Sequence, residues 1–206
     1  MLKNYVIITS AHSNSDRNYE YESSLISILN FSDFFDKIIL LECVSKNIDD
    51  LEYLKKYGIE IVISDFENSN QNYGINEFLH IDGFLKKNHE IKAEDNIIKI
   101  TGRYHLKNDI LLKKIPFESN IVAKLDGDIW DIFTGNNNRG VHTFYIIFKK
   151  IYISGFISYI TNNNINSMDP IEWMLKDYMS MNNEKFYDGE LGIETNFSIN
   201  GWKILT

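Results

Sequence analysis

The sequence predicts an α/β protein with a mostly parallel, mixed sheet that helices flank on both faces. Three observations predict this class: short apolar runs end in polar residues, amphipathic segments separate them, and the connections are too long for hairpins. The order β-α-β-α-β fits within the first 65 residues. Right-handed crossovers make such strands parallel and leave the helices covering the sheet.

The strands expected in the first half are almost continuous apolar runs, which is typical of strands buried on both faces. They are Tyr5–Ser10, Lys37–Val44, Glu60–Ser64 and Asn96–Thr101. The segments between them place apolar residues at helical spacing. We expect helices at Tyr21–Leu29, Ser45–Tyr57 and Gly74–Asn88, with Asn47 as an N-cap and Gly58 directly after the second helix.

The second half has weaker patterns. Its expected elements are a short helix at Asn108–Lys114, a fifth strand at Ile121–Leu125, a strand followed by a strand or helix within Val141–Ile160, a helix at Ile171–Met181, and a tail, Leu191–Thr206, packed back on the sheet. Pro116 ends the short helix, and Pro170 suits the first turn of the helix that follows it.

Composition excludes several classes of protein. The chain has 206 residues and a net charge of −8, so it is one domain in length and lacks the basic character of a dedicated nucleic-acid binder. With 44% apolar and 24% charged residues, it has an ordinary globular composition and is not a disordered chain.

The cysteine content and the lengths of the apolar stretches indicate the cellular compartment. Cys43 is the single cysteine and lies in an apolar run, which favours a reducing compartment and a buried thiol. No apolar stretch reaches the ~18 residues that span a bilayer, and the apolar part of the N-terminus is short for a signal peptide. We therefore expect a cytoplasmic protein, with peripheral contact at the inner membrane surface if its product is a membrane lipid or a polysaccharide.

Polar residues gather where the predicted strands end, at the edge where open parallel sheets bind their ligands. They are Thr9, Ser10 and His12 at the end of the first strand, Asp65 at the end of the third, Thr101, Gly102 and Arg103 at the end of the fourth, and Asp126 and Asp128 at the end of the fifth. Small hydroxyls, an Arg and carboxylates suit a ligand that carries phosphate and hydroxyl groups. Any single member could simply terminate a strand, so the prediction rests on the set.

Several common motifs are absent from the sequence. It contains no G-x-G-x-x-G after the first strand, no G-x-x-x-x-G-K-[ST], no H-E-x-x-H and no G-x-S-x-G. Hydride transfer with a dinucleotide, P-loop phosphoryl transfer, zinc chemistry of that type and α/β-hydrolase chemistry are therefore not expected.

Two acidic pairs are candidates for chemistry. Asp126 and Asp128 flank Gly127 at a strand end, where they could share Mn²⁺ or Mg²⁺, although an Asp-Gly-Asp turn is the simpler alternative. Asp169 and Glu172 lie at a helix start, where ionised carboxylates are favoured. Asp169 is expected to cap this helix, and Glu172 could complete the cap or act as a base.

One segment resembles a known family. Tyr73–Glu77 (YGINE) opens a helix, and Ile98–Tyr104 (IKITGRY) follows it. This pair is similar to small bacterial and viral transferases of surface-polysaccharide synthesis, which carry a K-[IL]-[ST]-G-R-Y strand. The order of elements over roughly residues 1 to 180 resembles the GT-A glycosyltransferases to which they belong.

The resemblance implies a hexosyltransferase-type enzyme. One domain, 1–206, would have a nucleotide-sugar-binding half, 1–105, and an acceptor-side half, 106–206, for a glycan or lipid-linked acceptor. The implied donor-site residues are Ser10, His12 and Asp65 around the base and ribose, Gly74 and Glu77 under the diphosphate-sugar, and Lys99, Thr101, Gly102 and Arg103 on the strand where many GT-A enzymes carry D-x-D. Because this chain lacks D-x-D there, either Asp126 and Asp128 hold a divalent cation or Arg103 meets the diphosphate.

The resemblance also implies a base, since an acidic residue at a late helix start deprotonates the acceptor hydroxyl in inverting members. Glu172 or Asp169 occupies such a position. Aromatic residues of 144–159 and Trp173 could stack on an acceptor sugar, although core packing also explains them. Two alternatives stay open: a nucleotidyltransferase, against which the Gly-free run Thr9–Ser13 counts, and a non-catalytic nucleotide-binding or scaffold relative.

Overall fold

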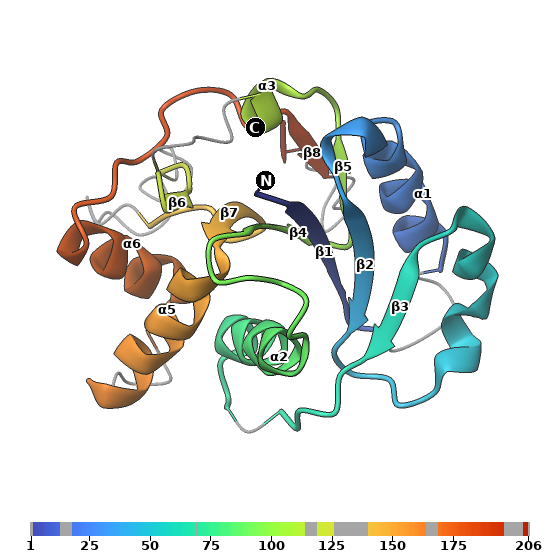
Figure 1. Cartoon of the computed structure of the whole chain (residues 1–206), viewed down its shortest axis with the longest axis horizontal. Coiled ribbons are helices and arrows are strands. Elements are labelled where there is room, and N and C mark those ends of the chain that lie inside the picture. Colours follow the sequence, from blue (N-terminus) through green and yellow to red (C-terminus); the bar gives the residue numbers. More distant parts are fainter. Residues whose placement is uncertain are drawn as a thin grey trace.

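A computed structural model describes residues 2–12, 18–68, 70–113, 119–125, 140–163, 169–195 and 204–205. Its main sheet has six strands in the order β3-β2-β1-β4-β7-β6 (Figure 1). Their bounds are β1 Asn4–Ser10, β2 Lys37–Glu42, β3 Glu60–Ile63, β4 Asn96–Thr101, β6 Ile121–Val122 and β7 Tyr145–Lys149. The pairs β1–β2, β1–β4 and β2–β3 are parallel, whereas β7 is antiparallel to both β4 and β6. The mixed, mostly parallel α/β class is confirmed.

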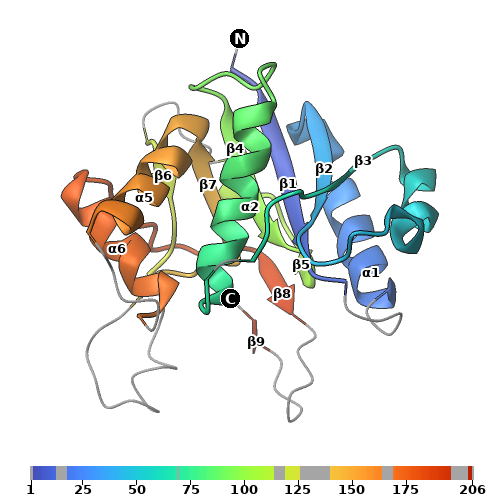
Figure 2. The same cartoon turned by 90° about the horizontal axis from the view of Figure 1, so that it is seen from below.

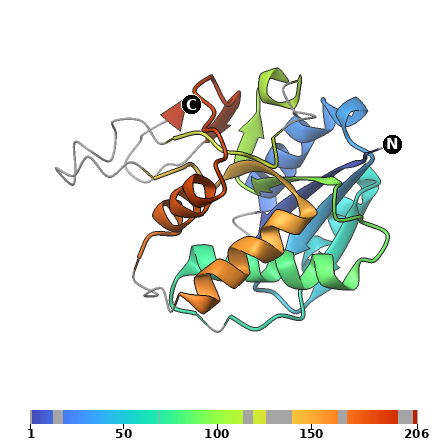
Figure 3. The same ribbon diagram turned by 60° about the vertical axis from the view of Figure 1, so that its left-hand side comes forward.

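Helices cover both faces of this sheet. Their bounds are α1 Asn18–Leu29, η2 Ser32–Phe34, η3 Ile48–Tyr57, α2 Tyr73–Lys87, α3 Ile110–Lys113, α5 Lys150–Asn162 and α6 Ile171–Met181. One face packs on α2, α5 and α6 through a core that includes Phe78, Phe156 and Met174. The other face packs on α1, η3 and α3 through Leu25 and Leu54 among others. Figure 2 shows α2 lying along the strands, and Figure 3 shows α5 beside it.

Local signals explain several element boundaries. The side chain of Asn47 accepts a hydrogen bond from the Asp49 N–H and so caps η3. Gly58 ends η3 with φ 71°, a left-handed conformation that glycine adopts without strain. Both roles agree with the prediction. No helix in the described ranges is long and apolar enough to cross a bilayer.

The second half departs from the prediction in two places, the fifth strand and the tail, and it settles one open alternative. The fifth strand is short, because regular pairing covers only Ile121–Val122. The segment Val141–Ile160 resolves into a strand followed by a helix, β7 and α5. The tail was expected on the main sheet, but β8 (Ile193–Thr195) pairs with β5 (Tyr104–Leu106) and β9 (Ile204–Leu205) in a separate sheet.

Candidate functional site

A cavity of about 590 Å³ lies at the carboxyl ends of β1 and β4, where α2 and α6 begin. It is lined by residues from both halves of the chain: Thr9, Ser10, Ala11, Tyr21, Cys43, Val44, Asn68, Gln71, Asn72, Tyr73, Gly74, Asn76, Glu77, His80, Thr101, Gly102, Arg103, Thr143, Pro170, Ile171 and Glu172. The position agrees with the rule for open parallel sheets, in which strand ends carry the ligand site.

The cavity floor consists of Thr9, Glu77 and Thr101, and Lys99 lies beneath it. Thr9 and Thr101 are register partners on β1 and β4, and both hydroxyls donate to Oε1 of Glu77. The other oxygen, Oε2, lies 2.9 Å from the Lys99 ammonium. The Glu77 carboxylate is therefore fixed on both oxygens before any ligand binds.

Lys99 supports this floor from beneath and does not line the cavity. Its side chain is 0% exposed, and its ammonium contacts Glu77, the Thr101 hydroxyl at 2.9 Å and the backbone carbonyl of Thr143. An ammonium has three protons, so these three acceptors use its whole donor capacity. A buried cation so engaged holds Glu77 in place and has no donor left for a phosphate.

A second buried carboxylate, that of Glu42, fixes the loops that follow β1 and β2. It accepts hydrogen bonds from the Ser10 hydroxyl at 2.5 Å and from three backbone N–H groups, those of His12, Val44 and Ser45. Glu42 is fully buried, so these bonds replace the water that the carboxylate would otherwise need. The Ser10 hydroxyl is thus directed at Glu42, although Ser10 lines the cavity.

Gly102, directly after β4, lies against the end of β1. Its N–H donates to the Thr9 carbonyl at 2.8 Å, and a Cβ placed on it would lie only 2.7 Å from that same oxygen. The next residue, Arg103, is the only Lys or Arg among the described residues that line the cavity. A guanidinium can bind two phosphate oxygens at once.

Glu172 enters the cavity from the first turn of α6. Its Oε1 accepts a hydrogen bond from the Thr143 hydroxyl at 3.0 Å. Because the Thr143 carbonyl also binds Lys99, one residue links this carboxylate to the cavity floor. The helix is not capped as predicted: Pro170 is the N-cap residue, and no side chain, that of Asp169 included, caps the first turn.

The cavity mouth consists of Asn68, Gln71 and Tyr73, three exposed residues that line the cavity. Behind it, α2 and α6 approach closely: a Cβ on Gly74 would lie 2.5 Å from Cγ2 of Ile171. The Asn72 side chain caps α2 by accepting from the Gly74 and Ile75 N–H groups, and it donates to the Asp169 carbonyl at 2.7 Å.

Two titratable groups of the cavity wall are held neutral. Burial, with the Lys46 charge second, lowers the pKa of His80, whose ring nitrogens lie 2.6 Å from the Ser64 hydroxyl and 2.9 Å from Oδ1 of Asn68. Burial, with the charges of Glu77 and Glu42, raises the pKa of the Cys43 thiol well above its usual range. Cys43 is therefore a protonated, buried thiol, as the sequence predicted, and not a nucleophile.

Most of the predicted site residues meet in the cavity, but four do not. Those that line it are Ser10, Gly74, Glu77, Thr101, Gly102, Arg103 and Glu172. The His12 ring contacts Oδ1 of Asn18, and the Asp65 side chain is 70% exposed and pairs with Lys87. Lys99 lies beneath the floor, and Asp169 contributes only its backbone carbonyl, which accepts a hydrogen bond from the Asn72 side chain. Asp126 and Asp128 lie outside the described residues.

Other residues of the site carried no signal in the sequence. Glu42 lies inside an apolar run, and Thr143 lies in a segment without clear periodicity. Of the aromatic residues considered for stacking, Tyr145, Phe148 and Phe156 are fully buried, so the alternative of core packing holds for these three. Tyr73, the exposed aromatic at the mouth, takes no part in the helical pattern of α2.

The described residues do not form a metal site. Within them, no group of three or more His, Cys, Asp or Glu side chains could hold a metal ion. In the cavity, Lys99 and two hydroxyls engage the Glu77 carboxylate, and Thr143 engages Glu172. The prediction of Asp126 and Asp128 as ligands of Mn²⁺ or Mg²⁺ stays a prediction.

Comparison with known proteins identifies the fold. No protein-family model and no curated protein matches the sequence. Among solved structures, the chain is similar to the 2-C-methyl-D-erythritol 4-phosphate cytidylyltransferase of Francisella tularensis, with a TM-score of 0.58 and 14% identity over 99% of this chain and 94% of that one.

Sugar transferases share the same fold. A putative nucleotide-diphospho-sugar transferase from Desulfovibrio desulfuricans gives a TM-score of 0.57 at 9% identity, over 92% of this chain and 80% of that one. Mouse xyloside xylosyltransferase 1 gives 0.52 at 11% identity, over 92% and 85%. The fold is thus one that glycosyltransferases and nucleotidyltransferases share, and at these identities the likeness carries no further than the fold.

Proposed function

We propose that the chain is a glycosyltransferase that moves a sugar from a nucleotide-sugar to a hydroxyl group of a glycan or lipid-linked acceptor. One observation carries this proposal: the carboxylate of Glu172 and the guanidinium of Arg103 share one cavity at the strand ends. A cation for a diphosphate and a base for a hydroxyl are the two charges that this transfer needs. Residues 1–105 would bind the donor, and residues 106–206 would supply Glu172, the base that acts on the acceptor.

Arg103 binds the diphosphate of the donor in this proposal. Its fork of N–H donors matches two phosphate oxygens and stabilises the charge that develops on the leaving group. Gly102, directly before Arg103, lies against the end of β1, where a Cβ would meet the Thr9 carbonyl. The fixed Glu77 carboxylate faces the sugar, whose hydroxyls can donate to it.

Glu172 acts as the general base. Thr143 holds Oε1, and the described residues offer no hydrogen bond to Oε2, which is left to the acceptor hydroxyl. The hydroxyl proton passes to Glu172, the hydroxyl oxygen bonds to the anomeric carbon, and the bond from that carbon to the diphosphate oxygen breaks. The nucleoside diphosphate leaves with the electron pair, and attack in line with it inverts the anomeric centre.

A divalent cation is a separate proposal. Mn²⁺ or Mg²⁺ held by Asp126 and Asp128 would supply further charge to the leaving diphosphate. No step above depends on it, since Arg103 supplies positive charge from within the described cavity. Cytoplasmic location and peripheral contact with the inner membrane surface likewise belong to the proposal.

A nucleotidyltransferase is the second candidate, and the fold likeness to a cytidylyltransferase over 99% of this chain favours it. Such an enzyme would take a nucleoside triphosphate and release pyrophosphate. The absence of glycine from Thr9–Ser13 counts against it, because a loop that cradles a triphosphate needs close backbone approach. A non-catalytic nucleotide-binding relative is the third candidate.

A thermal-shift panel separates the three. The probes are UDP-, GDP-, CMP- and dTDP-sugars and the nucleoside triphosphates, each with Mn²⁺ and with EDTA. A ligand at one hundred times its Kd adds about 2.7 kcal/mol, which raises Tm by roughly 5–10 °C at this chain length. A shift with a UDP-, GDP- or dTDP-sugar and release of its nucleoside diphosphate supports the proposal, whereas a shift with a CMP-sugar alone contradicts the assigned diphosphate leaving group. Pyrophosphate release from a triphosphate, or binding without turnover, contradicts it in favour of the second or the third candidate.

Replacing the base tests the mechanism. Glu172→Gln keeps the shape and the bond from Thr143 but cannot take a proton, so we expect kcat to fall about 10²- to 10⁴-fold. The thermal shift with the nucleotide-sugar should persist. Glu67→Gln, at an exposed carboxylate that does not line the cavity, is the matched control. Unchanged kcat in Glu172→Gln would remove Glu172 from the reaction.

A further inference from the structure

Tyr73 is an exposed aromatic residue at the cavity mouth. Its side chain is 90% exposed although it lines the cavity, whereas Tyr21, the other tyrosine of the lining, is 3% exposed. The described contacts assign no hydrogen bond or ring stacking to Tyr73. Water therefore covers a large apolar ring face at the entrance to a polar site, and a ligand that displaced this water would gain binding energy.

The backbone under this ring is fixed. Asn72 caps α2 directly before Tyr73 and reaches across to the Asp169 carbonyl. Directly after it, Gly74 packs so tightly on Ile171 that no Cβ fits between them. Tyr73 is thus an unpacked ring on a rigid support, and ordering such a ring costs little conformational entropy because it has only two side-chain torsions.

This support places the ring at the same cavity as the proposed base. Gly74 contacts Ile171, and Glu172 follows Ile171 in the chain. The ring and the carboxylate therefore come from the first turns of two helices that touch. Tyr73 and Glu172 line the same cavity, so one bound molecule can contact both.

The other groups of the cavity mouth are neutral amides. Gln71 is exposed with no hydrogen bond among the described contacts, and Asn68 uses its Oδ1 on His80, which leaves its NH₂ group available. Amides bind hydroxyl groups as donors and acceptors, and an aromatic face binds the C–H face of a pyranose. A lipid phosphate would need a cation here, but Arg103, the only Lys or Arg of the described lining, serves the donor diphosphate in the proposed reaction.

We propose that Tyr73 is the stacking platform of an acceptor subsite for a saccharide, whose pyranose ring lies on the phenol ring and presents a hydroxyl to Glu172. The inference rests on the proposed function and deepens it, because it selects a glycan end as the acceptor in place of a lipid phosphate. Asn68 and Gln71 bind the outer hydroxyls of the same sugar. Tyr73 is a binding residue and takes no part in proton transfer.

Saturation-transfer NMR tests the subsite directly. The probes are the methyl glycosides of glucose, galactose, mannose, N-acetylglucosamine and rhamnose, with and without the nucleoside diphosphate that the thermal-shift panel selects. We expect transfer to the C–H face of at least one glycoside. The Kd of that glycoside should be about tenfold higher for Tyr73→Ala than for the wild type, as loss of one aromatic stack implies. Tyr73→Phe and Tyr73→Trp should keep binding, since the ring and not the hydroxyl makes the contact.

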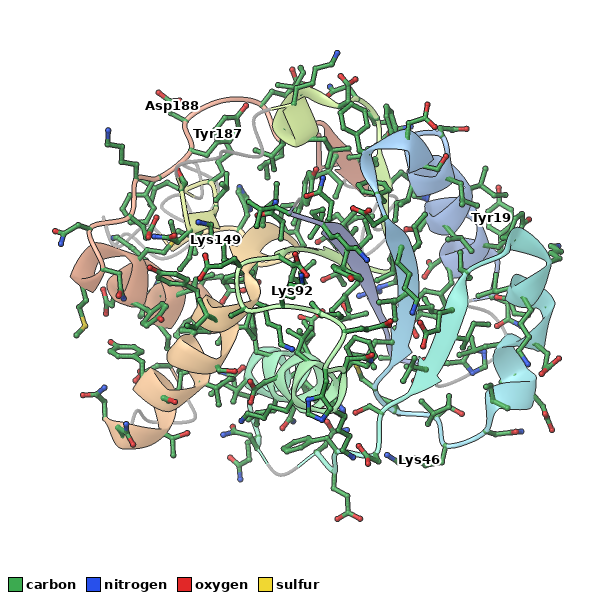
Figure 4. The ribbon with its side chains drawn as sticks, viewed as in Figure 1. Tyr19, Lys46, Lys92, Lys149, Tyr187 and Asp188 are labelled. Atoms are coloured by element: carbon green, nitrogen blue, oxygen red, sulfur yellow. The ribbon has the colours of Figure 1, made fainter. Side chains whose placement is uncertain are left out.

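Tyr19→Ala is the matched control. Tyr19 is 77% exposed on α1, at the opposite side of the sheet from α6 (Figure 4), and does not line the cavity. Its replacement should leave the Kd of the glycoside unchanged. Equal binding by Tyr73→Ala and the wild type, or no transfer from the wild type to any glycoside, would overturn the inference.

The nucleotide-sugar thermal shift separates failure of this inference from failure of the proposed function. Tyr73→Ala should keep that shift in full. If it loses the shift, the ring stacks on the donor base, which overturns the acceptor subsite and leaves the donor site standing. If the wild type binds a glycoside through Tyr73 but no nucleotide-sugar, the glycosyltransferase proposal fails while the saccharide subsite survives.

Discussion

The cavity floor and the cavity mouth are built on opposite principles. In the floor, the Glu77 carboxylate accepts from Thr9 and Thr101 and pairs with Lys99 beneath it, whose side chain is 0% exposed. In the mouth, Tyr73 is 90% exposed and makes none of the described hydrogen bonds or ring contacts. A region whose polar groups are already satisfied fixes geometry, whereas a region with unengaged groups can exchange water for a ligand.

The largest expected effect comes from breaking the floor at Glu77. Glu77→Leu leaves the ammonium of Lys99 buried without a counter-charge, so we expect the free energy of unfolding to fall by about 3–5 kcal/mol. Urea unfolding measures it. Lys99→Met should cost less, because Glu77 is 21% exposed and its carboxylate can recruit water.

A surface ion pair provides the control for the cost of breaking the buried pair of Glu77 and Lys99. Lys37 pairs with Glu60 at 2.7 Å, and both side chains are more than a third exposed. Lys37→Met should therefore change the free energy of unfolding by less than about 1 kcal/mol. Equal costs for Glu77→Leu and Lys37→Met would show that the floor is not a buried pair in solution.

The close contact of Gly74 with Ile171, behind the cavity mouth, should not tolerate an added methyl group. Gly74→Ala places a Cβ 2.5 Å from Ile171, so α2 and α6 must separate, at a cost of roughly 1–3 kcal/mol in unfolding free energy. The affinity for the methyl glycoside should also fall, whereas the nucleotide-sugar shift should not.

Gly83→Ala is the matched control for Gly74→Ala, in the same helix. A Cβ on Gly83 meets no atom within 4 Å, so this change should stabilise the protein by about 0.5–1 kcal/mol through helix propensity. A stabilising Gly74→Ala would contradict the close approach of α2 and α6. If the double variant Gly74→Ala/Ile171→Ala partly recovers the free energy of unfolding, the clash is assigned to Cγ2 of Ile171, because that variant removes this atom.

The smallest expected effect is a pH dependence at His80. Burial lowers its pKa in the folded chain below the ordinary value near 6.5, so the unfolded chain binds the proton more tightly. The stability that neutral His80 contributes is complete above about pH 6.5 and is lost as pH falls toward the folded pKa. NMR titration of the imidazole nitrogens measures this pKa, and a value at or above 6.5 would be inconsistent with burial as the controlling cause.

The fold follows from the sequence where local patterns suffice. The runs that became β1, β2 and β4 were readable because strands buried on both faces are apolar throughout. The small sheet of β5, β8 and β9 was not readable, because β5 and β8 pair over about 90 residues of sequence and all three strands are too short to carry a period of their own.

The site was predictable only in part, for a similar reason. The strand-end rule located Ser10, Thr101, Gly102 and Arg103 without any tertiary information. It could not show that Lys99 points beneath the floor, nor that the charge of Glu42 is buried in an apolar run. Burial of a charge depends on partners distant in sequence, and local spacing does not encode them.

The most direct measurement is a crystal structure with the nucleoside diphosphate selected by the thermal-shift panel. We predict that its phosphates lie within hydrogen-bond distance of Arg103 in the cavity, while Lys99 keeps its 2.9 Å contact with Glu77. A nucleotide bound elsewhere would contradict the proposed site. A nucleotide whose phosphates draw Lys99 away from Glu77 would contradict the distinction between a fixed floor and a ligand-binding mouth.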